Sequence, residues 1–223
     1  MLPRKLLATA PIPDTNKQLH LYQSGDLFSI KVLGLGDLMT TRMHGSERAL
    51  AELATAHLAK TPTPRLLVGG LGIGFTLRAA LDTLGECAQV VVAELVPEVV
   101  DWNREWIGAP AGHPLEDPRT SVFIGDVAKQ LRRPGSGFDA IMLDVDNGPE
   151  GWVRSDNDWL YSLEGLGSAR AALRRGGVLA IWSAGPDREF VQRLRKSGYR
   201  VQEHKVSPHR QGKGGYHHIW LAS

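Results

Sequence analysis

Short apolar runs alternate with segments of helical hydrophobic spacing along most of the chain. The runs are rich in β-branched residues, which is typical of strands buried on both faces of a parallel sheet. Seven of them predict strands, at 66–68, 89–93, 120–124, 138–143, 178–182, 199–206 and 216–221. Apolar residues three and four positions apart predict helices between them, at 76–84, 97–106, 163–173 and 187–196. This order predicts an α/β fold that is Rossmann-like and doubly wound, with a mostly parallel seven-stranded sheet and one antiparallel edge strand.

The N-terminal region has a different pattern. Residues 1–17 are rich in proline and lack periodicity, so they are predicted to form a loose arm. Alternating residues at 18–23 and 27–33, with a third strand at 38–43, predict a small β-meander. A helix is predicted over 46–58. The chain is therefore expected to divide into an arm and meander at 1–43 and a main domain at 44–223.

A glycine-rich turn joins the first strand of the main domain to its helix. Gly70, Gly72 and Gly74 form a G-x-G-x-G pattern, and Glu94 ends the next predicted strand. In nucleotide-binding βαβ units the glycines let a ligand approach the backbone, and an acid about 20 residues further on binds ribose hydroxyls. A dinucleotide site would place its third glycine at Phe75, so the spacing favours a nucleotide without a pyrophosphate. The alternative is a glycine turn that binds nothing.

Acidic residues follow the ends of further strands. Asp126 follows the third predicted strand of the main domain and Asp144 ends the fourth. Since ligands in doubly wound sheets lie beyond the carboxyl ends of the strands, both are site candidates together with Glu94. Asp144 could hold or deprotonate an acceptor group, or it could cap the next segment. Asp146, with Asn147, could extend the same polar floor, but the pair is equally a turn signal. No metal site is predicted.

The composition is that of an ordinary globular protein, at 42% hydrophobic and 22% charged residues. Cys87 is the single cysteine, which excludes an internal disulfide and fits a reducing compartment. Without a signal-like or membrane-length apolar run, the expected location is the cytoplasm, with no membrane partner. The net charge is +2. The basic residues after Gly165 fall mostly in predicted helices, which favours solvated helix faces over a nucleic-acid surface.

Several segments, in this order and spacing, resemble the spermidine synthase group of polyamine aminopropyltransferases, within the S-adenosylmethionine-dependent methyltransferase fold. They are LYQSGDLFSIKVLGLGDLMTTRMHGSERALAELA, VGGLGIGFTLRAAL, VVAELVPEVV, DPRTSVFIGDV and GFDAIMLDVDNGP. The resemblance covers about residues 18 to 183 and implies that 44–223 is a methyltransferase-like catalytic domain. It also implies a homodimer, and S-adenosylmethionine or its decarboxylated form as the bound nucleotide.

The resemblance further implies roles for single residues. Glu94 would bind the ribose hydroxyls, Asp126 the adenine amino group, and Asp144 would be the catalytic carboxylate, with Asp146 beside it. The nucleotide site would be completed by the three glycines and by the residues that follow the two acids. In full, the predicted cofactor-binding residues are Gly70, Gly72, Gly74, Glu94, Leu95, Asp126, Val127 and Asp144.

Three departures from the family pattern bear on the reaction. Ile73 stands where the family has an Asp that contacts the propylamine end of the donor, and Leu50-Ala51 stands at its Tyr-His pair. The turn after Asp144 is also shorter. An apolar side chain cannot pair with a primary ammonium. The sequence therefore favours methyl transfer to a small amine- or aromatic-bearing molecule, with aminopropyl transfer as the alternative, followed by a non-catalytic nucleotide-binding regulator and a nucleic-acid methyltransferase.

Two further groups of residues invite a functional interpretation. Acids and aromatic residues after Asp144, among them Trp152, Trp159 and Tyr161, predict a lid that receives a cationic amine, or else a surface loop with one aromatic on the core. His217 and His218 are neighbours in a predicted strand, so their side chains are expected on opposite faces and at most one can join a site.

Overall fold

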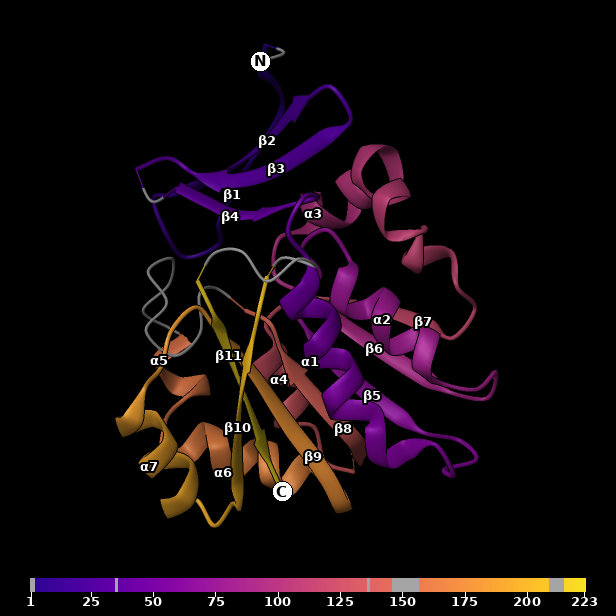
Figure 1. Cartoon of the computed structure of the whole chain (residues 1–223), viewed down its shortest axis with the longest axis vertical. Helices are drawn as coiled ribbons and strands as arrows, with labels where there is room; N and C mark the ends of the chain where they lie inside the picture. Colours follow the sequence, from indigo (N-terminus) through magenta and orange to yellow (C-terminus); the bar gives the residue numbers. More distant parts are fainter. Residues whose placement is uncertain (1–2, 35, 136, 146–156, 209–214) are drawn as a thin grey trace.

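The computed structural model describes residues 3–34, 36–135, 137–145, 157–208 and 215–223. These residues form two sheets, which Figure 1 shows as a small N-terminal layer above a larger sheet flanked by helices. None of the helices in the described ranges combines the length and the apolarity that a membrane crossing requires.

The N-terminal sheet has four antiparallel strands in the order β1-β2-β3-β4. Its strands are β1 (Lys5–Pro11), β2 (Gln18–Ser24), β3 (Leu27–Val32) and β4 (Gly36–Thr40). The meander is as predicted, but the prediction of a loose arm over 1–17 is wrong, because β1 lies within it and pairs with β2. Prolines around this segment suggest a loop, whereas the ladder to β2 and the burial of Ala10 and Ile12 hold it in the sheet.

The larger sheet has seven strands in the order β10-β11-β9-β8-β5-β6-β7. Its strands are β5 (Arg65–Gly69), β6 (Gln89–Glu94), β7 (Thr120–Ile124), β8 (Phe138–Leu143), β9 (Leu173–Ser183), β10 (Val201–Val206) and β11 (His217–Ala222). Strands β5 to β9 pair in parallel, and β11 runs antiparallel to both β9 and β10. The prediction of a mostly parallel seven-stranded sheet with antiparallel pairing at one edge is confirmed.

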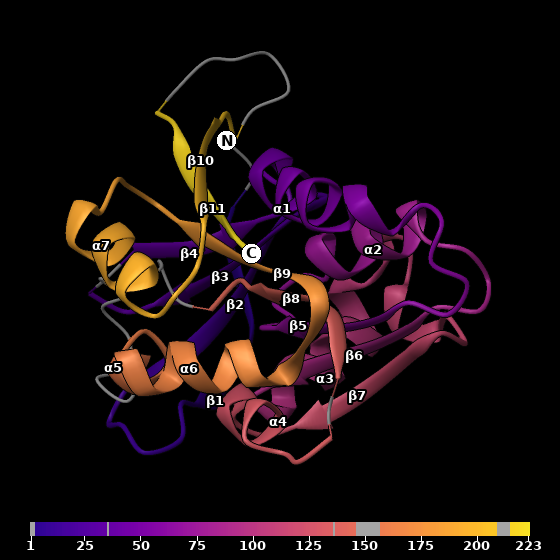
Figure 2. The same cartoon turned by 90° about the horizontal axis from the view of Figure 1, so that it is seen from below.

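Helices cover both faces of this sheet, with α1 and α2 on one face and α4 and α6 on the other (Figure 2). The main helices are α1 (Gly45–Thr55), α2 (Phe75–Thr83), α3 (Pro97–Trp102), α4 (Val127–Leu131), α5 (Asn157–Leu160), α6 (Leu163–Ala172) and α7 (Arg188–Lys196). Short turns η1 (Ala56–Leu58), η2 (Asn103–Ile107), η3 (Ala109–Ala111) and η4 (Pro114–Glu116) complete the connections.

The core follows the alternation of side chains along each strand. On β5, Leu66 and Val68 pack with α1 and α2, whereas Leu67 faces α6 and α7 on the other side. All three side chains are fully buried. Burial on both faces explains why the parallel strands appear in the sequence as continuous apolar runs.

The boundary between α6 and β9 differs from the prediction. Strand β9 begins at Leu173, five residues before the predicted strand at 178–182, and α6 ends at Ala172. Gly176, which follows the predicted helix at 163–173, lies inside β9 with a φ of +80°. Because glycine accepts this conformation without strain, the backbone changes direction there and the strand continues to Ser183.

Candidate active site

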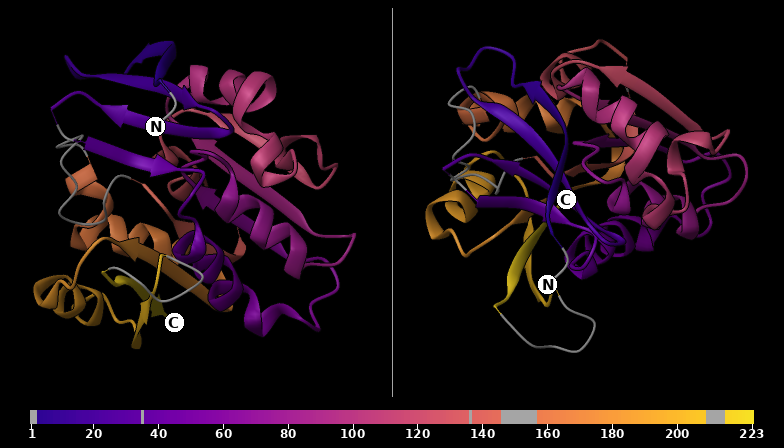
Figure 3. Two further views of the ribbon diagram at one scale, coloured as in Figure 1. Left: turned by 45° about the horizontal axis from the view of Figure 1, so that its top comes forward. Right: turned by 90° about the horizontal axis from the view of Figure 1, so that it is seen from above.

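A cleft lies between the N-terminal sheet and the carboxyl ends of the parallel strands. Figure 3 shows the N-terminal sheet as a separate layer beside these strands. The meander side of the cleft is apolar, and the opposite side carries backbone and acidic groups. Its lining residues are Ile12, Leu19, Ile30, Leu38, Met39, Gly70, Gly72, Ala93, Glu94, Leu95, Val96, Val99, Gly125, Asp126, Val127, Asp144 and Val145.

Two of the predicted glycines form part of the cleft wall. Gly70, with a φ of +90°, lies so close to the Asp144 carbonyl that a Cβ would overlap it. Gly72, with a φ of +52°, lies directly against the Met39 side chain of β4 and its carbonyl accepts a 2.7 Å hydrogen bond from Asn103 Nδ2. The turn is thus held between the end of β8 and the N-terminal sheet. Gly74 caps α2 and packs against Pro114, outside the lining of the cleft.

Glu94 ends β6 and is 8% exposed. One carboxylate oxygen accepts a 2.9 Å hydrogen bond from the Leu71 N–H, and the other accepts a 2.9 Å hydrogen bond from the Val96 N–H. Burial raises the pKa of this carboxyl, while the backbone N–H donors lower it. An ionised carboxylate has about four acceptor sites. Glu94 therefore retains acceptor capacity for hydroxyl groups of a ligand in the cleft that it lines.

Asp126 and Val127 line the cleft beside the end of β7. Asp126 caps α4, because its Oδ1 accepts a 2.8 Å hydrogen bond from the Ala128 N–H. Leu95 follows Glu94 and lines the same wall. The structure thus brings the predicted nucleotide-binding residues together in one cleft, with the exception of Gly74.

Asp144 follows the end of β8 and lines the cleft. Its Oδ2 accepts a 2.6 Å hydrogen bond from the Thr76 hydroxyl of α2. Burial raises the pKa of Asp144 to about 6, against the opposing effect of the Thr76 hydrogen bond. Asp146 and Asn147 lie outside the described residues, as does most of the predicted lid.

Glu47, in the first turn of α1, is an acid that the sequence analysis did not single out; it is not among the residues that line the cleft. Burial, and then the negative charge of Asp144, raise its pKa to about 7. Its Oε2 accepts a 2.7 Å hydrogen bond from the Ser46 hydroxyl. An acid in the first turn of a helix is an ordinary pattern, and only the packing of α1 near β8 brings Glu47 within reach of the charge of Asp144.

At two of the places where the sequence departs from the family pattern, the side chains lie in the core. Ile73 is 2% exposed and is absent from the cleft lining, although both glycines beside it have positive φ. Leu50 and Ala51 of α1 are also fully buried. No acid therefore replaces the family's Asp at the glycine turn itself.

Two aromatic residues of the predicted lid, Trp159 and Tyr161, are described by the structure, and neither lines the cleft. Tyr161 is 1% exposed and packs edge-on against Phe190 of α7, which agrees with the alternative of one aromatic residue on the core rather than with a place in a lid. Its ring fills the core between α6 and α7 instead. The half-buried Trp159 lies under the Arg132 guanidinium, 3.6 Å from the ring centroid. Trp152 lies outside the described residues.

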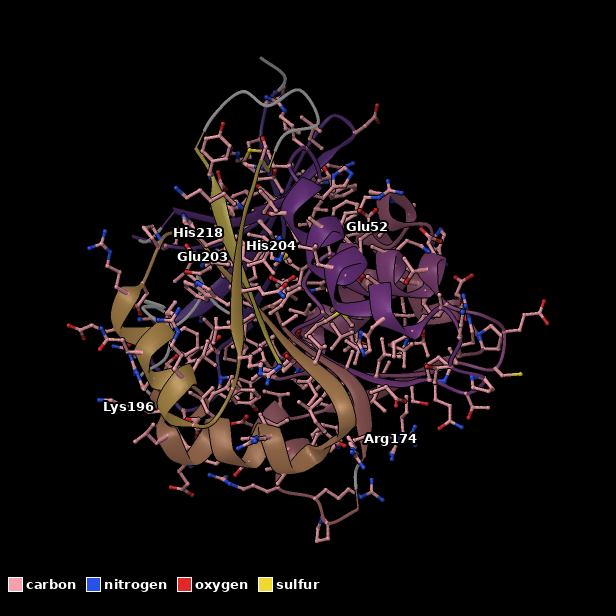
Figure 4. The ribbon with its side chains drawn as sticks, turned by 60° about the horizontal axis from the view of Figure 1, so that its bottom comes forward. Glu52, Arg174, Lys196, Glu203, His204 and His218 are labelled. Atoms are coloured by element: carbon pink, nitrogen blue, oxygen red, sulfur yellow. The ribbon has the colours of Figure 1, made fainter. Side chains whose placement is uncertain are left out.

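The neighbouring histidines face opposite sides of β11, as expected for a strand. His217 Nδ1 lies 2.8 Å from the Ser46 hydroxyl on the side of α1. His218 Nδ1 lies 2.5 Å from a Glu203 carboxylate oxygen on β10, where Figure 4 shows the two side by side. Only His217 is connected to the candidate site through described residues.

The spermine/spermidine synthase domain model matches residues 44–207, which include most of this cleft. The chain belongs to the spermine/spermidine synthase family. A polyamine aminopropyltransferase of Mycobacterium tuberculosis is 30% identical over 160 residues, covering 68% of this chain and 30% of that protein. A polyamine aminopropyltransferase of Nitrosomonas europaea is 34% identical over 125 residues, covering 56% of this chain and 36% of that protein. The alignments thus span about a third of the length of these family members.

Solved structures share the fold. The spermidine synthase from Thermotoga maritima superposes with a TM-score of 0.76 at 19% identity, covering 98% of this chain and 72% of that one. Human methyltransferase-like protein 13 in complex with SAH has a TM-score of 0.62 at 20% identity, covering 80% and 82%. The curated relatives are named polyamine aminopropyltransferases, whereas the sequence analysis ranked aminopropyl transfer below methyl transfer.

Proposed function

We propose that this protein transfers an aminopropyl group from decarboxylated S-adenosylmethionine to a cationic amine. The nucleoside of the donor occupies the cleft, with its ribose hydroxyls on Glu94 and its adenine amino group near Asp126. The sulfonium lies toward Asp144. Membership of the spermine/spermidine synthase family supports this proposal, as does the gathering of these residues in one cleft.

The observation that carries the proposal is the position of Asp144 in the lining of the cleft, together with Glu94 and Asp126. A propylamine-bearing donor and an amine acceptor each bring an ammonium group, and an ammonium buried without a counter-charge would cost several kcal/mol. Ile73 supplies no counter-charge, but the carboxylate of Asp144, which lines the cleft, would supply one when it is ionised. Each ionised carboxylate also favours binding of the cation by charge-assisted hydrogen bonds.

The proposed reaction consists of a deprotonation followed by a nucleophilic attack. The acceptor ammonium loses a proton to a carboxylate at Asp144, and its nitrogen then attacks the propyl carbon next to the sulfonium. The C–S bond breaks with its electron pair passing to sulfur, which leaves a neutral thioether. Asp144 is held for this task by the Thr76 hydroxyl. General base catalysis of this kind contributes about 10²- to 10⁴-fold to the rate.

A second candidate is methyl transfer from S-adenosylmethionine to an amine. It is favoured by Ile73, because the glycine turn bears no acid that would repel the carboxylate of this donor. Backbone N–H groups at such turns readily receive an anion. In this reaction Asp144 would bind the acceptor alone.

Product analysis distinguishes these candidates. The protein is incubated with each donor and a series of primary diamines, and the amines are analysed by mass spectrometry. An aminopropyl unit added only with the decarboxylated donor supports the first proposal, whereas a methyl group added only with S-adenosylmethionine supports the second. Binding of both nucleotides without formation of either product would instead favour a non-catalytic nucleotide-binding regulator. The cytoplasmic location and the homodimer stay predictions.

A further inference from the structure

A cavity of about 500 Å³ lies between α7 and the last two strands of the large sheet. Its helical wall is formed by Arg188, Val191, Gln192 and Arg195. These residues are spaced three or four positions apart, so they lie on one face of α7. The cavity shares no lining residue with the cleft, and it is therefore a separate feature of the molecule.

The opposite wall of the cavity comes from β10 and β11. Lys205 of β10 and His218 of β11 are cross-strand partners, so their side chains leave the sheet on the same face. Glu203, two residues before Lys205, shares this face. His218 is 4% exposed, and its Nδ1 lies 2.5 Å from a Glu203 carboxylate oxygen (Figure 4). In the part of the chain that the structure describes, its Nε2 has no hydrogen-bond partner.

Three cations line this cavity without a counter-charge of their own. They are Arg188, Arg195 and Lys205, and all three are exposed. None of them forms an ion pair with another residue of the described ranges. Exposed side chains of this kind keep their hydrogen-bond donors available to a ligand.

The two acids beside these cations are already engaged. Asp187 caps α7, because its Oδ1 accepts a 2.8 Å hydrogen bond from the Phe190 N–H. Glu203 is paired with His218. Positive charge therefore exceeds negative charge in the cavity, and the excess is carried by groups that no described carboxylate occupies.

The charge and the size of the cavity point to a particular class of ligand. Guanidinium groups bind carboxylates and phosphates through two parallel N–H donors. The volume falls within the range of small-molecule sites, about 300–1,000 Å³. Pro186 and Val191 add an apolar part to the wall, which suits an organic body rather than a bare inorganic ion.

We propose that this cavity binds a small organic anion with two or more negative charges, of the phosphate ester or polycarboxylate kind. Arg188 and Arg195 bind the anionic oxygens, and Lys205 supplies a third positive charge from the facing strand. His218 holds the Glu203 carboxylate away from the ligand. The site does not depend on the proposed transfer, because none of its residues lines the cleft.

The ligand class is tested by NMR titration of the ¹⁵N-labelled protein with phenyl phosphate and with phthalate. Phenol, which has the same ring without the negative charge, is the neutral control. At least one of the two anions is expected to bind with a Kd of about 1 mM or lower, and the stronger of them shows whether phosphate or carboxylate is preferred. A Kd above about 1 mM for both anions, or equally tight binding of phenol, would overturn the proposal.

Two substitutions with opposite expected effects locate the binding. Arg195→Gln should weaken binding of the preferred anion by about tenfold, because a charge-assisted hydrogen bond is lost. Glu203→Gln should strengthen it by about two- to fivefold, because a negative charge is removed while the amide oxygen can still accept from His218. Partial unfolding could not produce both results.

The matched control is Lys196→Gln. Lys196 is exposed on the same helix but does not line the cavity, and Figure 4 shows it well apart from Glu203 and His218. Its substitution should change the Kd by less than about twofold. Equal weakening by Arg195→Gln and Lys196→Gln would overturn the site. Binding of single-stranded RNA that both substitutions weaken, without binding of either small anion, would replace it with a nucleic-acid surface.

Discussion

Replacing Glu94 by Gln tests the proposed contact between the Glu94 carboxylate and the ribose of the nucleotide. Both carboxylate oxygens already accept backbone hydrogen bonds, from the N–H groups of Leu71 and Val96. The glutamine amide has one oxygen and one NH₂, so one of these backbone donors must face another donor. Leaving a buried donor without an acceptor costs about 1–3 kcal/mol. For a chain of this size that corresponds to a fall in Tm of about 3–8 °C.

The same substitution should weaken nucleotide binding. A ribose hydroxyl that donates to an ionised carboxylate contributes about 1.5–3 kcal/mol, so S-adenosylhomocysteine should bind about 10- to 150-fold more weakly to Glu94→Gln. Titration calorimetry measures this change directly. Since burial raises the pKa of Glu94, affinity should also fall as the pH is lowered and the carboxylate becomes protonated.

The control for both effects is Glu105→Gln, which removes a carboxylate from the exposed surface of η2. It should change neither Tm nor affinity. A folded Glu94→Gln protein that binds S-adenosylhomocysteine within about twofold of the unmodified protein would refute the ribose contact. Glu94 would then serve only to hold the turn after β5 against the end of β6.

Three further predictions follow from the cleft. Asp126→Asn keeps an oxygen to cap α4 but loses the charge, so discrimination between adenosine and inosine analogues should shrink in competition binding while Tm changes little; intact discrimination would make Asp126 a helix cap only. Gly72→Ala should lower stability by about 1–3 kcal/mol because its Cβ would overlap Met39, and Met39→Ala should restore part of this loss in denaturant unfolding; no rescue would contradict the contact. Rising salt should weaken binding of a diamine more than binding of S-adenosylhomocysteine, because the diamine depends on charge; equal salt sensitivity would argue against recognition of a cation.

The main domain could be predicted well from the sequence because its signals are local. Each parallel strand is a continuous apolar run, and Gly70, Glu94, Asp126 and Asp144 mark the strand ends that meet in the cleft. Strand β1 was missed because its pairing with β2, rather than its own pattern, places it in the sheet. The pairing of β1 with β2 cannot be predicted from the sequence of a short segment flanked by prolines.

The effect of Asp144 on the pKa of Glu47 could not be predicted, because the two residues are far apart in the sequence. This effect depends on how α1 packs across the sheet near β8. The direction of the Ile73 side chain could not be predicted from the sequence either. Positive φ angles at Gly72 and Gly74 redirect the backbone on both sides of it, and the side chain enters the core. Ile73→Asp would therefore bury an unpaired charge and unfold the turn rather than change the choice of donor.

The most direct test of the account is the product formed by the unmodified protein. Decarboxylated S-adenosylmethionine and S-adenosylmethionine are each supplied with a primary diamine, and the amine products are identified by mass spectrometry. The account predicts an amine lengthened by one aminopropyl unit, formed only with the decarboxylated donor, together with the neutral thioether nucleoside. A methylated amine formed only with S-adenosylmethionine would contradict it.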